Sequence, residues 1–223
     1  MAIVTVDFDG TLYQGNSFKA MFEIGKQRFT MSQWLVVAGG LVKASAVGLI
    51  KGKTKFQHDF FKAFAKTFKG LTNTELELFF QELVQFGKKD VNQDLVVKIR
   101  EHKKKGDTII ILSGALHPFL KAFTSDLQLD VHVISTELLF DHNGLCSGEI
   151  GQIVNGNVKV EKLQEWTTQQ EILTNSPTNE IWAYADSESD IPLLKYVTHP
   201  IVVNPKEDMI KIAEQNKWVI FAS

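Results

Sequence analysis

Short apolar runs that end in polar residues recur along the chain. The first run covers residues 2–6 and is rich in β-branched side chains, as is typical of a buried parallel strand. Four similar runs follow much later, at residues 107–112, 131–135, 180–185 and 201–203. Helix-length segments lie between them, at residues 115–124, 159–173 and 191–196. The alternation predicts an α/β fold with a doubly wound, mainly parallel, Rossmann-like sheet and right-handed crossovers.

The pattern changes between the first and second strands, where no clear strand is found. This stretch holds eleven of the sixteen Phe residues, together with Leu, Ala and Lys at helical spacing. A periodic set of Phe lies on one face of the expected helix: Phe56, Phe60, Phe61, Phe64 and Phe68. We therefore predict a helical cap of residues 14–89 that covers the active end of the sheet like a lid. Residues 1–13 and 90–223 would form the catalytic core.

A second, smaller insertion is expected over residues 137–154. The dipeptide Asn143-Gly144 lies there between the apolar run 138–140 and a segment that contains Ile150. Asn-Gly between two apolar runs favours a tight turn that joins antiparallel strands. The sequence thus predicts a small β-hairpin on the core.

Composition narrows the classes of partner. The 223 residues are 44% hydrophobic and 22% charged, and the formal charge is −2. Such a chain can bury a sizeable core, and it lacks the positive field that would attract nucleic acid. The single cysteine, Cys146, fits a reducing compartment, and the N-terminus lacks the basic region of a signal peptide. A cytoplasmic location is expected.

Candidate chemistry begins where the first strand ends, at Asp7 and Asp9, followed by Gly10. In open α/β sheets, ligands bind outside the carboxyl ends of the strands. Two carboxylates this close repel each other unless a cation neutralises them or one is protonated. A divalent metal with oxygen ligands is the favoured solution, and a surface turn is the alternative.

Two later strand ends carry similar signals. Ser113 and Gly114 follow the second strand and precede a helix expected near residue 115, which suggests an anion site at a helix N-terminus; Ser113 as a simple helix cap is the alternative. Asp186 and Asp190 follow the fourth run, which indicates a metal shared with the first strand end. Asp190 as a cap of the next helix is the alternative there.

A site that combines carboxylates with phosphate also needs a cationic side chain. Lys159 and Lys162 are the candidates, at the start of the helix that precedes the Asp186 strand. The six histidines show no spacing typical of a zinc site. His117 lies four residues after Ser113, and we expect it to be structural or solvated.

These motifs resemble those of the haloacid dehalogenase superfamily of aspartate-dependent phosphohydrolases. The segments that carry the resemblance are Asp7-Phe8-Asp9-Gly10-Thr11-Leu12, Ile111-Leu112-Ser113-Gly114 and Asp186-Ser187-Glu188-Ser189-Asp190. The position of the helical insertion resembles that in the phosphoserine-phosphatase-like subclass IB. In that subclass the catalytic lysine is commonly followed by a hydrophobic residue and, four positions on, by Leu. Lys159 fits this pattern, and Lys162 remains the alternative.

The resemblance implies a phosphatase mechanism with Mg²⁺ as cofactor. Asp7 would be the nucleophile that forms an aspartyl-phosphate, and Asp9 would be the acid and then the base. Mg²⁺ would bind the Asp7 carboxylate, the Asp9 backbone carbonyl and Asp186. A true dehalogenase has no need of an acid at position 9.

The resemblance also assigns the residues around the phosphate. Ser113 and the Gly114 amide would hold phosphate oxygens, and Lys159 would neutralise both Asp7 and the phosphate. Asp190 would position Lys159. A phospho-aspartate signalling or binding protein without turnover is an alternative, although signalling receiver domains are much shorter.

The substrate is expected to be a phosphorylated small molecule or a lipid phosphate. The segment 13–18 has no counterpart of the Glu by which phosphoserine phosphatases recognise the amino group of the substrate. Residues 34–50 contain only one charged residue, Lys43, and lysines follow at positions 51, 53 and 55. This segment suggests either a buried or dimerising cap helix pair or peripheral membrane contact. It also resembles the cap of bacterial phosphatidylglycerophosphate phosphatases, so a lipid phosphatase of that type is an alternative.

Overall fold

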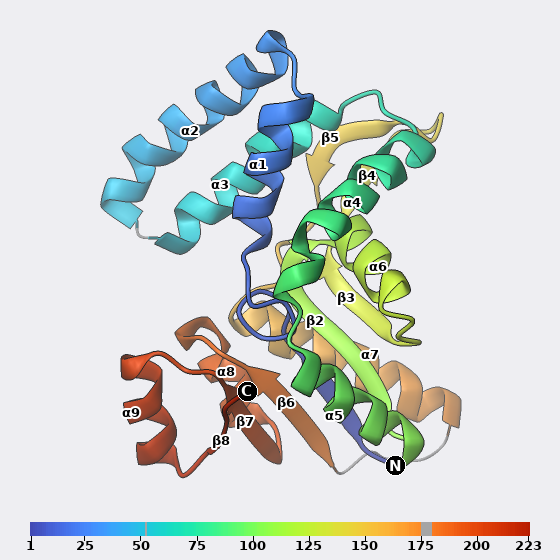
Figure 1. Cartoon of the computed structure of the whole chain (residues 1–223), viewed down its shortest axis with the longest axis vertical. Helices are drawn as coiled ribbons and strands as arrows, with labels where there is room; N and C mark the ends of the chain where they lie inside the picture. The colour runs from blue at the N-terminus through green and yellow to red at the C-terminus, as the bar shows by residue number, and fades with distance from the viewer. Residues whose placement is uncertain (52, 175–179) are drawn as a thin grey trace.

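The structure is a computed structural model that describes residues 1–51, 53–174 and 180–223; within these ranges the side chains of 41, 43–51, 53–57 and 174 are not described. Six parallel strands form one sheet in the order β3-β2-β1-β6-β7-β8 (Figure 1). The strands are β1 (Ile3–Val6), β2 (Thr108–Leu116), β3 (His132–Thr136), β6 (Ile181–Ala185), β7 (His199–Val203) and β8 (Val219–Phe221). The predicted doubly wound α/β sheet is confirmed.

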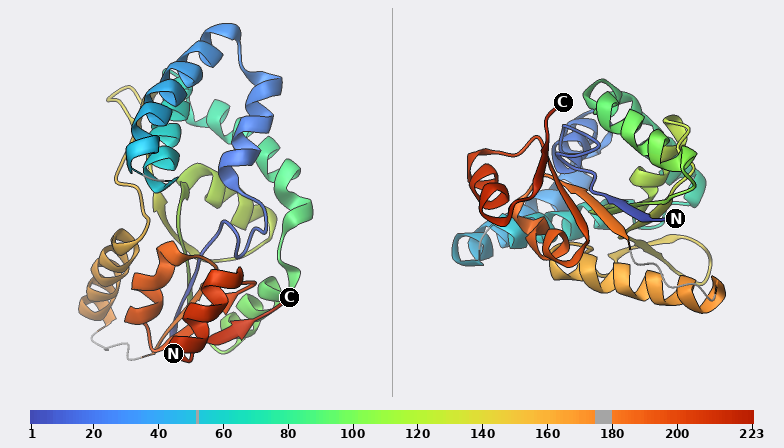
Figure 2. Two further views of the ribbon diagram at one scale, coloured as in Figure 1. Left: turned by 90° about the vertical axis from the view of Figure 1, so that its left-hand side faces the viewer. Right: turned by 90° about the horizontal axis from the view of Figure 1, so that it is seen from below.

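Helices cover both faces of this sheet. They are α5 (Gln93–Lys104), α6 (His117–Asp126), α7 (Asn157–Thr174), α8 (Ile191–Tyr196) and α9 (Glu207–Asn216). Alternate residues of β2 point to opposite faces, because side chains alternate along a strand. Ile109 and Ile111 join a core cluster with residues of α5 and α6, whereas Ile110 and Leu112 join a second cluster with residues of α7, α8 and α9. Figure 2 shows α7 running along one face of the sheet.

A helical segment lies between β1 and β2 and stands over the carboxyl edge of the sheet (Figure 1). Its elements are α1 (Ser17–Arg28), α2 (Met31–Lys51), α3 (Lys53–Ala65), the 3-10 turn η1 (Lys66–Phe68) and α4 (Asn73–Gly87), followed by the 3-10 turn η2 (Lys88–Asp90). Helices thus occupy the stretch in which the spacing of Phe, Leu, Ala and Lys predicted them. We call residues 14–89 the cap from here on. Among the described residues, no helix is long and apolar enough to cross a membrane.

Aromatic packing joins the cap to the core. Within the cap, the ring of Phe64 lies 4.9 Å from that of Phe29 and 5.3 Å from that of Phe60. The rings of Phe80 on α4 and Phe119 on α6 lie 6.4 Å apart, and these buried side chains belong to one continuous cluster. The predicted Phe face is therefore buried at positions 60, 61, 64 and 68, whereas the side chain of Phe56 is outside the described residues.

The two chain segments that connect cap and core are hydrogen-bonded side by side. The Gln14 backbone N–H donates to the Asp90 carbonyl at 2.8 Å, and the Asn92 N–H donates to the Leu12 carbonyl at 3.0 Å. The Asn92 side chain is buried; its Oδ1 accepts from the Leu95 N–H and thereby caps α5. The entry to the cap and the exit from it are thus fixed at one place.

The predicted hairpin is present as β4 (Leu138–Phe140) and β5 (Cys146–Ile150), with Gly144 at φ +76° in the turn. It reaches up to the cap, because the Cys146 N–H donates to the Leu71 carbonyl and the Gly70 N–H donates to the Cys146 carbonyl, both at 2.8 Å. Its tip therefore extends the cap rather than standing free on the core.

Two boundaries differ from the sequence prediction. The second strand continues to Leu116 across an irregularity after Ser113, because Leu116 still pairs with Thr136 of β3. The following helix therefore begins at His117 rather than near residue 115, with Pro118 in its first turn, a position that proline favours. The sheet also has a sixth strand, β8, which the apolar runs did not predict.

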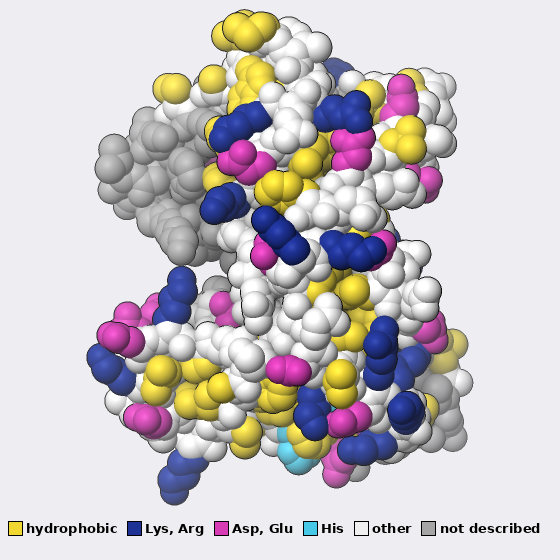
Figure 3. Space-filling model, viewed as in Figure 1, with side chains coloured by type: hydrophobic (Ala, Val, Ile, Leu, Met, Phe, Trp, Pro, Cys, Tyr) yellow, Lys and Arg dark blue, Asp and Glu magenta, His cyan; other side chains and the backbone are white. Residues whose placement is uncertain are grey.

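Figure 3 shows the outline of the molecule narrowing between the cap above and the sheet below. On this face, Lys and Arg side chains are interspersed with Asp and Glu over both parts (Figure 3). Such mixing fits the formal charge of −2 and produces no extended field of one sign on the face shown.

Candidate active site

Asp7 and Asp186 meet because their strands are neighbours. β1 pairs with β6 so that Val6 lies opposite Tyr184, and the Asp7 N–H continues this ladder by donating to the Tyr184 carbonyl at 2.9 Å. Val6 also lies opposite Ile111 of β2. The carboxyl edge therefore places Asp7 between Asp186 on one side and the segment that contains Ser113 on the other.

A tight loop after β1 makes this approach possible. The Gly10 N–H donates to the Tyr13 carbonyl at 2.7 Å, and the Tyr13 N–H donates to the Phe8 carbonyl at 2.9 Å. Gly10 has φ +85°, and a Cβ atom placed there would lie 2.3 Å from Asp186 Oδ2. Glycine thus satisfies two requirements at this position, the left-handed backbone and the close contact with a carboxylate.

Lys159 links two of the aspartates. Its Nζ donates to Asp7 Oδ1 at 2.6 Å and to Asp190 Oδ1 at 2.5 Å, and the Lys159 side chain is only 2% exposed. The residue lies in the first turn of α7, and Leu163, one turn later on the same face, is fully buried against the sheet. The packing of Leu163 against the sheet therefore brings the ammonium group of Lys159 to the edge of β1.

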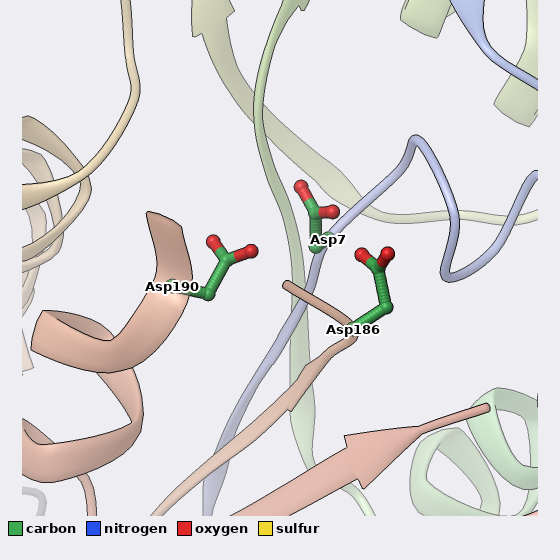
Figure 4. A group of neighbouring side chains, drawn as sticks. All are labelled: Asp7, Asp186 and Asp190. Atoms are coloured by element: carbon green, nitrogen blue, oxygen red, sulfur yellow. The ribbon is translucent and has the colours of Figure 1, made fainter. Parts of the chain in front are cut away.

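Hydroxyl groups orient the remaining carboxylates. Thr11 Oγ1 donates to Asp186 Oδ1 at 3.1 Å, and Ser187 Oγ donates to Asp190 Oδ2 at 2.8 Å. Figure 4 shows the side chains of Asp7, Asp186 and Asp190 pointing toward one another from the ends of β1 and β6 and from the turn before α8. Carboxylate oxygens of these three residues lie within 4.8 Å of one another.

The charges in this cluster are unbalanced, since the ammonium of Lys159 faces three carboxylates. Burial raises the pKa of Asp7, and Asp190 and Asp186 add to that effect, although Lys159 opposes it. Burial and Asp190 also raise the pKa of Asp186. Burial alone would lower the pKa of Lys159, but Asp190 and Asp7 raise it above its ordinary value. A further cation would relieve this repulsion, and hard oxygen ligands suit Mg²⁺ or Ca²⁺.

The Asp9 carboxylate is hydrogen-bonded to Ser17 at the start of α1 rather than to the other site residues. Its Oδ1 accepts from the Ser17 backbone N–H at 2.6 Å, and its Oδ2 accepts from Ser17 Oγ at 2.5 Å. Burial raises the pKa of Asp9 to about 7, although the two hydrogen bonds from Ser17 lower it. A carboxyl group with that pKa can both give and accept a proton near neutral pH.

Ser113 and Gly114 lie inside β2 rather than at a helix N-terminus, which corrects the expected anion site at the start of a helix. Ser113 is buried, and its Oγ accepts from the Ala115 N–H at 3.3 Å. A Cβ atom on Gly114 would lie 3.4 Å from the Val154 carbonyl oxygen. The local donors available to an anion there are the serine hydroxyl and strand amides, without the dipole of a helix.

Three other predictions concern side chains near the site. Lys162 points outward and pairs with Glu165 at 2.7 Å, so the structure brings Lys159 and not Lys162 to the aspartates. Asp190 stands at the helix start but makes no capping bond with its side chain. His117 Nδ1 contacts Ser135 Oγ and Glu137 Oε1, each at 3.1 Å, and lines a groove of about 1590 Å³ between α4, α6 and the hairpin. Asp7, Asp186 and Asp190 do not line that groove.

The sequence did not identify three residues whose hydroxyl groups contact the site aspartates: Thr11, Ser17 and Ser187. Thr11 and Ser187 were within the quoted motifs, and hydroxyl groups within two positions of an aspartate were an available signal. Ser17 contacts Asp9 only because the loop between them folds back, and no spacing rule indicates that contact.

The comparisons with known proteins identify the family of the chain. The haloacid dehalogenase-like hydrolase family matches residues 4–195, and the chain belongs to this family. The family prediction made from the three motifs is thus confirmed.

Two curated relatives match about half of the chain. A histidinol-phosphatase of Neisseria meningitidis serogroup C is 26% identical over 123 residues, which are 55% of this chain and 54% of that protein. A probable phosphatase of Mycobacterium tuberculosis is 25% identical over 124 residues, 56% of this chain and 41% of that protein. The chain thus spans about half the length of these relatives in the matched regions.

Solved structures share the fold over nearly the whole chain. A protein of unknown function from Bordetella pertussis Tohama I superposes with a TM-score of 0.79 at 19% identity and covers 99% of this chain and 97% of that one. A probable phosphoserine phosphatase from Vibrio cholerae superposes with a TM-score of 0.66 at 17% identity, over 94% of this chain and 58% of that one. At such identities the likeness concerns the fold.

Proposed function

We propose that this protein is a Mg²⁺-dependent phosphomonoester hydrolase that works through an aspartyl-phosphate on Asp7. The observation that carries the proposal is the buried ammonium of Lys159, held between Asp7 and Asp190 beside Asp186. A phosphate ester is anionic, so a carboxylate can attack it only where cations offset the charge of both. The family membership and the phosphatases among the relatives support the same chemistry.

In the first step, Asp7 attacks phosphorus and a P–O bond to the carboxylate forms. The ester P–O bond breaks, its electron pair stays on the leaving oxygen, and Asp9 gives that oxygen a proton. In the second step, water gives a proton to Asp9 and attacks phosphorus, which releases Asp7 and inorganic phosphate. Lys159 neutralises charge in both steps.

The other proposed residues bind and position. Ser113 and the Gly114 amide would hold phosphate oxygens, while Asp190 fixes the Lys159 ammonium. Asp7, Asp186 and the Asp9 backbone carbonyl would hold the Mg²⁺ ion. When bound, Mg²⁺ stabilises charge on the transferring phosphoryl group. Residues 14–89, as a cap over this edge, would select the substrate.

A panel of phosphomonoesters that includes histidinol phosphate and phosphoserine tests the proposal, with Mg²⁺ and with a chelator. We expect phosphate release with Mg²⁺ and its loss after chelation. Acid quenching with a ³²P-labelled substrate should leave the label on the peptide that contains Asp7. Steady release also separates this function from a phospho-aspartate protein without turnover, which would stop after one equivalent.

The Asp7→Asn variant is the sharpest control. The amide is nearly isosteric but a poor nucleophile, so we expect turnover to fall by about 10³-fold or more while the circular dichroism spectrum stays unchanged. Metal-dependent phosphatase activity retained by this variant would refute the assignment of Asp7.

We also expect Asp9→Asn to slow turnover severely, and an unchanged rate would exclude Asp9 as the acid and base.

A lipid phosphate is the second candidate substrate. Helix α2 exposes apolar side chains at Met31, Leu35 and Val42, which are 79%, 71% and 70% exposed. The other apolar side chains of the 34–50 segment, beyond Val42, are outside the described residues, as are those of Lys51, Lys53 and Lys55. Flotation with anionic liposomes and assays of short-chain lipid phosphates test this candidate. Absence of both binding and turnover would eliminate it.

A further inference from the structure

The carboxylate of Asp9 belongs to the core but is held by the cap. Asp9 lies in the loop after β1, whereas Ser17 is the first residue of α1. The Ser17 N–H and Oγ–H donate to the two different oxygens of Asp9, at 2.6 and 2.5 Å. Ser17 is fully buried. Two bonds from one residue fix the position of the carboxylate and also the plane of the group.

The Ser17 hydroxyl is not required to cap the helix. Helix α1 already has a cap in Asn16, whose Oδ1 accepts from the Lys19 N–H at 3.2 Å. A buried serine hydroxyl needs a hydrogen-bond partner, and the partner here is the carboxylate of Asp9. The contact therefore concerns the orientation of Asp9 more than the start of α1.

We propose that Ser17 is a positioning residue for proton transfer, which aligns the Asp9 carboxylate from the cap. The inference rests on the proposed phosphatase function. Each carboxylate oxygen has two acceptor sites, and Ser17 occupies one on each oxygen. The other sites stay available for the proton that Asp9 gives to the leaving oxygen and later takes from water. Because Ser17 is part of α1, the alignment of the core acid depends on the position of a cap helix.

Leaving groups of different basicity test this step. The alkoxide of a simple alkyl phosphate needs a proton as the P–O bond breaks, whereas the leaving group of 4-nitrophenyl phosphate is stable as an anion. The ratio kcat/KM includes only the steps up to phosphoryl transfer to Asp7, so it isolates the proton donation. In Ser17→Ala we expect kcat/KM to fall by about tenfold or more for glycerol phosphate or ethyl phosphate, but by less than about threefold for 4-nitrophenyl phosphate.

Two further variants make the result specific. Ser17→Thr keeps a hydroxyl at the same position, and we expect it to restore the alkyl-ester value to within about threefold of the wild type. Thr72→Ala is the matched control, because Thr72 also places a hydroxyl at the start of a cap helix, α4, where its Oγ1 accepts from the Glu75 N–H. This control should leave the ratio of the two kcat/KM values unchanged.

Equal losses for both esters in Ser17→Ala, or no rescue by Ser17→Thr, would overturn the positioning role. If the wild type hydrolyses neither ester, the proposed function fails for these substrates, and the structural readout then decides about Ser17. Crystal structures of the wild type and Ser17→Ala would show a reoriented Asp9 carboxylate if Ser17 positions it. An Asp9 side chain in the same orientation in both would contradict the proposal.

Discussion

The carboxyl edge of the sheet and the cap above it are stabilised by different interactions. At the edge, the buried Lys159 ammonium contacts Asp7 and Asp190. In the cap, Phe64 packs among phenylalanine rings, with neighbours such as Phe29 and Phe68 at 4.9 and 5.6 Å. Ion pairs between buried side chains stabilise the site, whereas dispersion and the hydrophobic effect stabilise the cap.

This difference separates function from stability. A buried charge has few possible partners, so the loss of one partner leaves the others uncompensated. Each aromatic ring in a cluster has several neighbours, and the loss of one ring removes packing without leaving a charge unpaired. Substitutions that leave a charge unpaired at the sheet edge should therefore impair both chemistry and stability, whereas substitutions within the aromatic cluster of the cap should impair stability alone.

The largest combined loss of stability and turnover in this comparison is expected for Lys159→Met. This change leaves Asp7 and Asp190 buried without their cation, and we expect it to lower the free energy of unfolding by about 3–5 kcal/mol. Turnover should fall by about 10²–10³-fold, because the transferring phosphoryl group loses a stabilising charge. Lys162→Met is the matched control, since its ion pair with Glu165 lies at the surface and contributes about 0–1 kcal/mol. Urea unfolding and phosphate release measure both quantities, and similar results for the two lysines would contradict the comparison.

Phe64→Ala should affect stability to a similar degree but not chemistry. The buried ring leaves a cavity, and we expect a loss of about 3–5 kcal/mol in the free energy of unfolding. The kcat of the fraction that remains folded should be unchanged. Phe140→Ala removes a ring that is 39% exposed and should cost about 1 kcal/mol or less. A strong loss of kcat in folded Phe64→Ala would show that cap packing and site geometry are not separable.

Much of the site could be predicted from local patterns. Apolar runs that end in acids identified Asp7 and Asp186, because the carboxyl ends of parallel strands meet at one edge. Spacing alone did not distinguish Lys159 from Lys162, and the resemblance to a family was needed. One physical signal was available: Lys159 stands four residues before the buried Leu163, and therefore on the inward face of α7.

Other features depend on contacts that no local pattern encodes. β8 has three residues, too short for a recognisable alternation, and only its pairing with β7 defines it. Helix α6 begins at His117, later than the sequence predicted, because Leu116 still pairs with Thr136 of β3. The contact between Ser17 and Asp9 requires the loop at Gly10 to fold back, and a positive φ cannot be derived from hydrophobic periodicity.

The smallest effect is expected when two glycines with the same backbone conformation are each replaced by alanine. Gly10 at the sheet edge and Gly70 in the cap both have φ +85°, so an alanine is strained at either position, by about 1–2 kcal/mol. A Cβ atom at Gly70 would meet nothing within 4 Å, whereas one at Gly10 would lie 2.3 Å from Asp186 Oδ2. Gly70→Ala thus measures the backbone strain alone, and Gly10→Ala adds the displacement of a proposed metal ligand.

We expect both alanine variants to unfold at lower urea concentration, with the larger loss in Gly10→Ala. In that variant, the Mg²⁺ concentration for half-maximal activity should also rise by about tenfold, because the carboxylate of Asp186 has to move. Gly70→Ala should leave the Mg²⁺ dependence unchanged, since no site residue contacts that position. Equal stability losses with an unchanged Mg²⁺ titration in Gly10→Ala would mean that the edge tolerates displacement of Asp186. The contrast between a charged edge, where a substitution impairs the site, and an aromatic cap, where it does not, would then not hold at this residue.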